Sequence, residues 1–393
     1  ALDTLKEIKG YKKKIAVLTW YRGVDAKEIE KITSKSAADL GAEYRVTIGT
    51  NVAETGVTMN IGRVLDTGLM REVIFDPRVG VTASAKVIIG GDGVKQRRGR
   101  VGRIGPGEHF LLFSQATLNA MNAKVAINDA EKSNPCGEIL DAYSIFAASP
   151  AGLSRFLGRY SAETLIYCHR LLFMHGLLRG SFAPTVTPLG RLAALLSKRV
   201  EYALLLLHAA ARGRAVLHYA SILVSFLDRE SENTELVTED NTNLADQAGR
   251  RELAAQVRTC LKPRNDFVLL LYTVIFELAK WRELSVESQK KMAELMKQAV
   301  KTELIVIAAV EMEPAVDRPN ECETLAALHE CILAAFAFSR AVRLTNGNYR
   351  LTSHTLSPVS LPGTAPAAVV YHGISLDAGG RAVIDYCAET PAL

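Results

Sequence analysis

The chain has 393 residues, of which 48% are hydrophobic and 23% are charged, so most of it should fold around buried cores. Its formal net charge of +5 permits a nucleic-acid partner but does not require one, because the placement of charge matters more than its total. The longest apolar runs are shorter than the roughly 20 residues of a membrane span, and the six cysteines show no zinc-binding spacing, which predicts an intracellular protein with reduced thiols and no membrane segment.

Residues 1–115 alternate strand-like and helix-like patterns. Short β-rich apolar runs occur at four places, and the stretch Asp25–Ile32 has apolar residues at helical spacing. Strands that alternate with helices predict a parallel α/β sheet. Two further β-rich arms, Val73–Phe75 and Lys86–Ile89, flank a bend with proline and glycine, which predicts a β-hairpin. The four strand-like runs are Lys14–Trp20, Tyr44–Thr50, Arg63–Gly68 and His109–Phe113.

Leucine- and alanine-rich helical patterns dominate from about residue 116 onward. The stretch Ser161–Leu178 predicts a helix with Ser161 as its N-cap. Thr187 followed by Pro188 predicts the start of another helix, because proline is accommodated at the first helical position. In about the last 60 residues, strand and turn patterns return. The dipeptide Asn346–Gly347 between β-rich arms predicts a hairpin, and the whole segment a small β-barrel beside the helical block.

Two stretches combine residue types that suit phosphate. The segment Lys95–Arg103 has five positive charges and two glycines in nine residues. Glycine lets a backbone approach closely and arginine offers a planar fork to phosphate, although a basic surface loop has the same composition. The other stretch is Thr47–Gly68, in which a β-rich strand runs into hydroxyl and amide side chains and the next strand ends at Asp66. These side chains are Thr50, Asn51, Thr55 and Thr58. Polar residues at the ends of parallel strands bind ligands in α/β sheets, although Asp66 fits a turn cap equally well.

Together these stretches resemble motifs V and VI of superfamily 2 helicases. The motif VI pattern Gln-Arg-x-Gly-Arg-x-Gly-Arg is met in full from Gln96 to Arg103. The motif V pattern Ala-Thr-Asn-x-Ala-Glu-Thr-Ser/Gly-x-Thr is met from Thr50 to Thr58, with Gly49 in place of the usual alanine. The hairpin segment, the residues after motif VI, residues 178–196 and residues 368–393 resemble DEAH-box and related DExH RNA helicases in the same order along the chain.

This resemblance implies a multidomain architecture of α/β, α and β parts. Residues 1–120 would form the second RecA-like helicase lobe, with motifs IV to VI and the β-hairpin. Residues 121–196 would form a linker and a winged helix. Residues 197–330 would form a helical ratchet-like bundle, and residues 331–393 a C-terminal OB-like β-barrel.

The resemblance also implies a site for ATP. Arg100 and Arg103 would be arginine fingers that reach the γ-phosphate from the second lobe and stabilise charge in the transition state. Gln96 would position the attacking water or the γ-phosphate. The further nucleotide contacts that the resemblance implies are Gly56, Thr58 and Asp66.

RNA is the second ligand that the resemblance implies. Thr50, Asn51 and Thr19 would contact the sugar-phosphate backbone of a single strand, which positions RNA without reading its sequence. The hairpin would act as a wedge or strand guide. In the barrel, Tyr349 and Arg350 are candidate RNA contacts, and ordinary strand roles fit them equally well. The barrel surface would also suit a regulatory protein.

The sequence departs from the family at several points. It contains neither a GxxxxGK[ST] phosphate loop nor a DEAH or DExH tetrad, which hold ATP and Mg²⁺ in the first lobe of such enzymes. We therefore expect the first lobe to be absent from this chain, and the chain alone not to hydrolyse ATP. The segment between motif IV (Ile15–Ile32) and motif V is short. Leu69 follows Asp66-Thr67-Gly68, the Asp-x-Gly of motif V, at a position where the family often has an aromatic residue that stacks on adenine.

The primary hypothesis is the C-terminal portion of a DEAH/RHA-type RNA helicase. In the intact protein it would couple ATP hydrolysis to 3′-to-5′ movement along single-stranded RNA and remodel RNA or ribonucleoprotein. The alternative is a non-catalytic, helicase-derived RNA-binding scaffold in a large ribonucleoprotein assembly, which the missing lobe and the short segment favour. The complete motif VI favours the enzyme, because a scaffold has no chemical need for two finger arginines. Motifs V and VI alone would also permit a viral helicase of the same superfamily.

Overall fold

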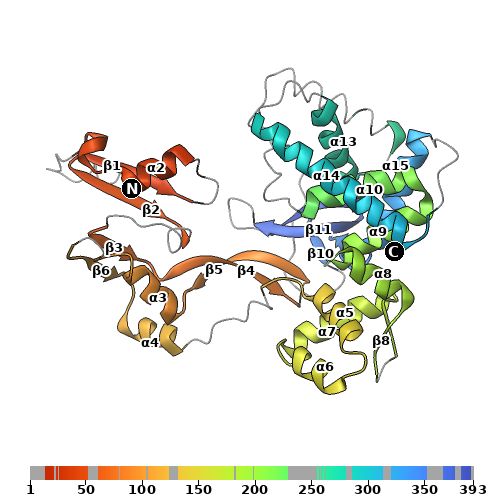
Figure 1. Ribbon diagram of the computed structural model, residues 1–393, viewed down its shortest axis with the longest axis horizontal. Helices are drawn as coiled ribbons and strands as arrows, with labels where there is room; N and C mark the ends of the chain where they lie inside the picture. The colour runs from red at the N-terminus through yellow and green to blue at the C-terminus, as the bar shows by residue number, and fades with distance from the viewer. Residues whose placement is uncertain are drawn as a thin grey trace. The chain divides into compact units, whose positions relative to one another are not determined.

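The chain divides into two compact units, one made of residues 1–73 with 84–127 and the other of residues 74–83 with 128–393. The first is an α/β unit, and the second is mainly helical with a small sheet (Figure 1). The computed structural model describes residues 14–21, 24, 26–51, 61–78, 80–102, 105–123, 132–180, 183–197, 199–228, 255, 257, 259–261, 263–279, 286–312, 320–351, 366–376 and 382–390.

Parallel strands with helices beside them make up the first unit. Its elements are β1 (Ile15–Trp20), α2 (Ala26–Ser34), a 3-10 turn (Ala38–Leu40), β2 (Tyr44–Gly49), β3 (Arg63–Asp66), α3 (Gly91–Arg98), β6 (Glu108–Leu111) and α4 (Gln115–Ala123). β1 pairs with β2 and β3 pairs with β6, both in parallel. The predicted α/β type is confirmed, although the described strands form two separate two-stranded sheets instead of one.

Two small cores hold this unit together. α2 packs on β1, and Trp20 at the end of β1 is buried against Ile32 of α2. Trp20 is therefore a core residue and not a base-stacking one. The other core lies around α3 and α4, and its buried members are Ile89, Val94 and Met121.

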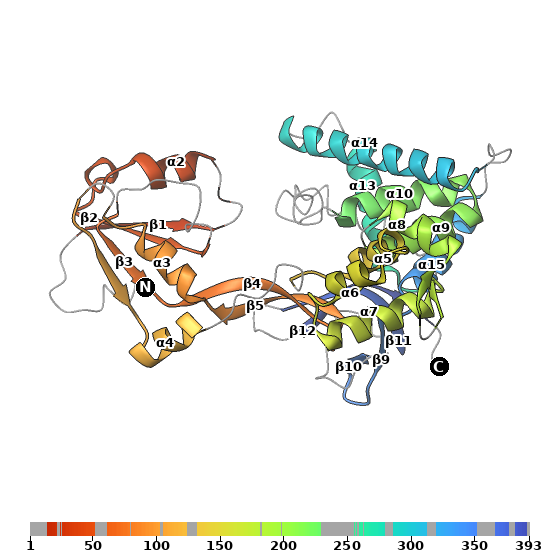
Figure 2. The same cartoon turned by 60° about the horizontal axis from the view of Figure 1, so that its bottom comes forward.

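The predicted β-hairpin is confirmed, with longer arms than the sequence indicated. It consists of β4 (Leu69–Asp76) and β5 (Val81–Ile88), which form a continuous two-stranded ribbon (Figure 2). Residues 74–83, which we call the hairpin tip, belong to the second compact unit, whereas the rest of the hairpin belongs to the first.

The second unit then continues with three helices, a short hairpin and a fourth helix. These are α5 (Cys136–Ile145), α6 (Pro150–Leu157), α7 (Ala162–Met174), β7 (Leu178–Arg179), β8 (Thr185–Val186) and α8 (Pro188–Leu196). Both predicted caps are confirmed. The Ser161 hydroxyl accepts a hydrogen bond from the backbone N–H of Thr164 at 3.2 Å, and the Thr187 hydroxyl accepts one from Gly190 at 3.0 Å. Pro188 occupies the first turn of α8, as predicted.

Longer apolar helices form the main core of the second unit. They are α9 (Val200–Arg212), α10 (Arg214–Asp228), α13 (Asp266–Ala279), α14 (Val286–Ala309) and α15 (Glu321–Ala335). α10 packs against α9, α14 and α15 through mainly apolar side chains, with Glu303 of α14 bonded to His218 of α10 (Figure 1). The predicted polar loop Asp228–Asn243 lies outside the described residues beyond Asp228.

The four C-terminal strands form an antiparallel sheet in the order β10-β9-β11-β12. Their bounds are β9 (Arg340–Arg343), β10 (Tyr349–Leu351), β11 (Ala368–Leu376) and β12 (Ala382–Glu389). The hairpin at Asn346–Gly347 is confirmed, with Gly347 at a φ of 85°. The predicted closed barrel is not found, because the outer strands β10 and β12 do not pair with each other in the described part of the sheet. Instead, α13 and α15 contact β12.

The prediction of reduced thiols is wrong for one pair of cysteines. Cys260 and Cys322 form a disulfide, although they lie 62 residues apart and so give no spacing signal. No helix in the described ranges has both the length and the apolar character of a membrane span. The same ranges contain no group of three or more His, Cys, Asp or Glu side chains placed to hold a metal ion. The remaining cysteines are free and buried, namely Cys136, Cys168, Cys331 and Cys387.

Candidate nucleotide and RNA site

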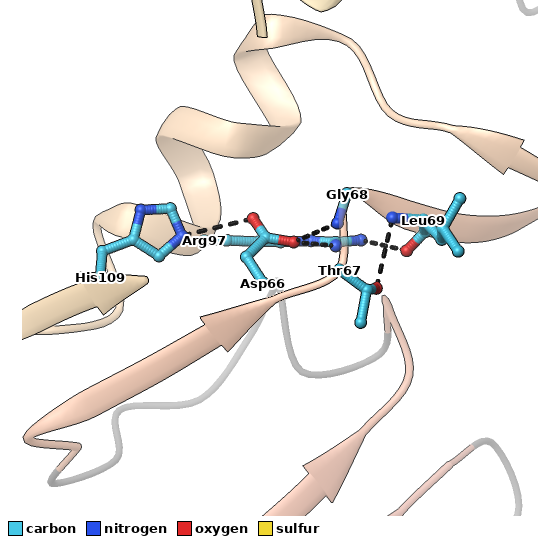
Figure 3. A network of polar contacts seen from close by, with 6 residues as sticks. All are labelled: Asp66, Thr67, Gly68, Leu69, Arg97 and His109. Carbon is cyan, nitrogen blue, oxygen red and sulfur yellow. Dashed lines mark hydrogen bonds and ion pairs between the residues drawn. The ribbon is translucent and has the colours of Figure 1, made fainter. Parts of the chain in front are cut away.

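A buried carboxylate joins motif V to motif VI (Figure 3). Asp66 is the last residue of β3, and its side chain has no solvent exposure. One of its oxygens, Oδ1, accepts hydrogen bonds from Nη1 of Arg97 at 2.7 Å and from the backbone N–H of Gly68 at 2.8 Å. The other oxygen, Oδ2, lies 3.3 Å from Nε2 of His109. The carboxylate is thus held by three partners from three segments, as a buried charge requires.

Arg97 binds two points of the β3–β4 corner at once. Besides its contact with Asp66, its Nη2 donates to the backbone carbonyl of Leu69 at 3.0 Å. The Arg97 side chain is 14% exposed, so both contacts are largely removed from water. A planar guanidinium can span two such acceptors, whereas a lysine ammonium is a single point charge. Arg97 therefore fixes α3 to this corner, a role that the sequence did not indicate.

The backbone at this corner requires glycine. Gly68 has a φ of 70°, in the left-handed region that favours glycine. A Cβ atom at this position would lie 2.6 Å from Cε of Met121 and 2.8 Å from the ring of Phe113. The hydrogen bond from the Gly68 N–H to Asp66 closes the turn. The structure thus gives Asp66 the turn-capping role that the sequence left open beside nucleotide contact.

The predicted catalytic residues lie where α3 ends. Gln96 is an exposed residue in its last turn, and Arg100 follows the helix after Gly99 and is partly exposed. The Arg100 N–H donates to the carbonyl of Arg97 at 3.1 Å, which continues the helical turn. Gln96 and Arg100 therefore lie one turn apart, beside the residue that fixes the helix. Arg103 lies outside the described residues.

Three predicted RNA contacts come together at one end of the β1–β2 sheet. The strands are in register so that Trp20 lies beside Gly49, and the Thr50 N–H donates to the Trp20 carbonyl at 2.9 Å. Thr19 and Thr50 are exposed, and Asn51 is partly exposed. The carboxyl ends of parallel strands are where α/β sheets bind ligands. The structure therefore groups these three residues, whereas Gly56 and Thr58 lie outside the described residues.

The two residues suggested on the C-terminal sheet have different environments. Tyr349 is fully buried, and its hydroxyl donates to the carbonyl of Pro366. Burial raises the pKa of this hydroxyl. Its ring is therefore not available to stack on a base, and the ordinary strand role applies to it. Arg350 is exposed on β10 and remains a candidate RNA contact.

Comparison of the sequence with curated proteins finds helicases. A putative DEAH-box ATP-dependent helicase of Mycosarcoma maydis is 36% identical over 110 residues, which is 25% of this chain and 7% of that protein. The pre-mRNA-splicing factor ATP-dependent RNA helicase prp22 of Schizosaccharomyces pombe is 32% identical over 97 residues, or 24% of this chain and 8% of that protein. A putative ATP-dependent RNA helicase of Acanthamoeba polyphaga mimivirus is 41% identical over 88 residues, or 22% and 5%. No family model matches the chain.

Comparison of the fold covers nearly the whole chain. The DExH-box NTPase HrpB of E. coli matches 97% of this chain and 40% of its own chain, with a TM-score of 0.66 and 16% identity. A second structure of the Escherichia coli DEAH/RHA helicase HrpB matches 97% and 41%, with a TM-score of 0.61. The sequence matches span less than a tenth of each of the three helicases above. The homologues of this chain are thus DEAH-box RNA helicases, and its fold is similar to that of the DExH-box protein HrpB.

Proposed function

We propose that the chain is the C-terminal portion of an ATP-dependent RNA helicase of the DEAH type. Residues 1–120 would be the second RecA-like lobe. Residues 121–196 would be a linker and winged helix, which the order of three helices, a short hairpin and a fourth helix supports. Residues 197–330 would be the ratchet-like bundle. Residues 331–393 would correspond to the OB-like domain, of which the four-stranded sheet is the described part.

The observation that carries this proposal is the attachment of motif VI to motif V. Arg97 holds the C-terminal turn of α3 at the end of β3, so the backbone that carries the following residues is fixed in position. Preorganised donors stabilise developing charge without reorganising during the reaction. Arg100, with Arg103, would act as the arginine fingers on the γ-phosphate, and Gln96 would orient the attacking water. ATP and Mg²⁺ would be held mainly by a phosphate loop and an acidic motif, neither of which this sequence contains.

RNA binding would use the end of the β1–β2 sheet. The exposed hydroxyls of Thr19 and Thr50 and the amide of Asn51 suit the sugar-phosphate backbone, which carries no sequence information. Arg350, which lies in the second unit, is a separate candidate RNA contact. A regulatory protein on the C-terminal sheet remains a further proposal.

One observation favours the alternative of a non-catalytic scaffold. The connection from α2 to β2 contains only a short 3-10 turn, and Tyr44, Val46 and Ile48 on β2 are 42–50% exposed. Parallel sheets are normally covered on both faces, so an uncovered apolar face suits an assembly partner. The alternative predicts an intact protein that binds RNA without RNA-stimulated ATP hydrolysis.

The experiment compares full-length wild-type protein with the Arg100→Ala variant. Loss of an arginine finger lowers the rate of phosphoryl transfer by about 10³-fold or more, so RNA-stimulated ATPase should fall by that factor. RNA affinity should stay within about twofold, since Arg100 does not lie in the RNA site. Arg98→Ala is the matched control, because Arg98 is an exposed cation of the same segment with no proposed role. If both variants hydrolyse ATP at the wild-type rate, the finger assignment is wrong.

A further inference from the structure

The hairpin tip is packed into the core of the second unit. Phe75, near the end of β4, is 4% exposed and belongs to the same buried cluster as the helices of this unit. Its ring meets the ring of Tyr167 of α7 edge to face, with the ring centroids 5.3 Å apart. Such pairs stabilise beyond the area that they bury. Phe75 therefore anchors the tip in this core, whereas the Arg78 side chain in the same turn is exposed.

The turn of the tip is shaped to approach Tyr167 closely. Gly80 has a φ of 66°, and a Cβ atom there would lie 2.5 Å from the Tyr167 ring and hydroxyl. The Gly80 N–H donates to the carbonyl of Asp76 at 2.8 Å, and the Asp76 carboxylate is paired with the Arg78 guanidinium at 2.7 Å. Only glycine satisfies both the backbone conformation and the contact. The turn is therefore fixed against α7 as well as within itself.

Tyr167 has a second aromatic partner. Its ring makes a second edge-to-face contact with Phe338, at 5.3 Å between ring centroids. Phe338 lies between α15 and β9, so Tyr167 joins the hairpin tip to the part of the second unit that precedes the C-terminal sheet. The tip should therefore follow any displacement of this core.

The opposite end of the hairpin, which we call its root, is attached to motif VI. Arg97 donates to the carbonyl of Leu69, the first residue of β4. The N–H of Ile89, directly after β5, donates to the carbonyl of Gly68 at 3.0 Å. Both strands are thus fixed at the corner that also holds Asp66. Between root and tip, β4 is one uninterrupted strand.

We propose that the β4–β5 hairpin couples the core of the second unit to motif VI, with Tyr167 holding its tip and Arg97 holding its root. A displacement of the core on RNA binding is then transmitted along the strands to the turn that carries Arg100. Phe75, Gly80 and Tyr167 are positioning residues that act on ATP hydrolysis through this connection. The effect on ATP hydrolysis rests on the proposed helicase function, whereas the connection between tip and root does not.

The connection is tested on this chain by amide hydrogen exchange followed by mass spectrometry. Tyr167→Ala should speed exchange in the hairpin tip and also in residues 97–100 by at least about fivefold, the lower end of typical coupling between two sites. Tyr167→Phe keeps the ring and should preserve wild-type exchange in both. Ile166→Ala is the matched control, because Ile166 is 59% exposed on the same helix. Gly80→Val perturbs the contact from the hairpin side and should reproduce the result if Tyr167→Ala does not fold.

Two results of the exchange experiment would overturn the proposal. Unchanged exchange in the tip would mean that Tyr167 does not hold it, and faster exchange in the tip alone would mean that its motion does not reach motif VI. In the full-length protein, Gly80→Val and Tyr167→Ala should reduce the stimulation of ATPase by RNA by at least about fivefold. The ATPase rate without RNA should be unchanged in both variants. Tyr167→Phe, which keeps the ring, should show the wild-type stimulation. Undiminished stimulation in Gly80→Val and Tyr167→Ala would also overturn the coupling. If RNA does not stimulate the ATPase of the wild-type protein, the proposed function is contradicted, and the exchange experiment alone decides whether the connection exists.

Discussion

Removal of the Arg97 side chain is the sharpest perturbation of the motif V–motif VI junction. In Arg97→Ala, the Asp66 carboxylate would stay fully buried with only the Gly68 N–H and His109 beside it. Breaking a buried ion pair by removing one partner costs about 3–5 kcal/mol. Arg97→Lys keeps a positive charge but cannot span Asp66 and the Leu69 carbonyl, so it should lose about one hydrogen bond, or about 1 kcal/mol. The order wild type, lysine, alanine is itself part of the prediction.

Urea unfolding followed by tryptophan fluorescence measures this in the first unit. The chain has two tryptophans, and in a Trp281→Phe background the buried Trp20 is the sole reporter. With a denaturant slope of about 2 kcal/mol per molar, a loss of 3–5 kcal/mol lowers the unfolding midpoint by about 1.5–2.5 M. Arg98→Ala is the control, since Arg98 is exposed on the same helix. If Arg97→Ala unfolds within about 0.5 kcal/mol of Arg98→Ala, the junction does not hold the unit together.

Three further predictions concern the second unit. Burial lowers the pKa of His329, whose Nδ1 accepts a hydrogen bond from the Asn265 amide at 2.9 Å and must therefore stay unprotonated. Because the unfolded state then binds more protons than the folded state, stability should fall as the pH drops below about 6.5, and His329→Gln should flatten this dependence in thermal unfolding. Gly190→Ala places a Cβ 2.2 Å from the Leu177 carbonyl oxygen, so overpacking should cost about 1–3 kcal/mol in denaturant unfolding. Cys260→Ser removes a disulfide across 62 residues and should cost about 4 kcal/mol, and thiol titration of the unfolded wild type without reductant should find four free thiols.

Each of these has a result that contradicts it. A free energy of unfolding that is flat between pH 7.5 and pH 5.5 would contradict the histidine effect. Burial also lowers the pKa of three other histidines, which should add to the same pH dependence, namely His169, His175 and His208. Gly158→Ala is a comparison for Gly190→Ala, because Gly158 has an ordinary φ of −62° and a Cβ there meets no atom closer than 3.4 Å. Six free thiols in the unreduced protein would show that the disulfide does not form.

Local signals in the sequence were sufficient for several helix starts and turns. The hydroxyl caps Ser161 and Thr187 and the Asn346–Gly347 turn act within three or four residues, so their patterns predict them. Contacts between distant residues left no such pattern. Arg97 meets Asp66 across 31 residues and Phe75 meets Tyr167 across a much longer stretch, and neither pair has a characteristic spacing.

The same limit explains the corrections. Tyr349 lies in a strand whose alternation cannot tell which side faces the core, and the structure buries it with its hydroxyl bonded to the Pro366 carbonyl. Closure of a barrel depends on pairing between the first and last strands, which no turn motif specifies. The junction around Asp66 was found only in part, because the sequence shows motif V and motif VI as separate stretches and the corner between them exists only in the folded chain.

The central claim is that motif VI of this chain acts on ATP. The most direct measurement is single-turnover ATP hydrolysis by the full-length protein with saturating RNA, in the Arg100→Ala and Arg98→Ala variants. The account predicts that Arg98→Ala hydrolyses ATP at the wild-type rate and that Arg100→Ala is slower by about 10³-fold or more. Equal rates for the two variants would contradict it.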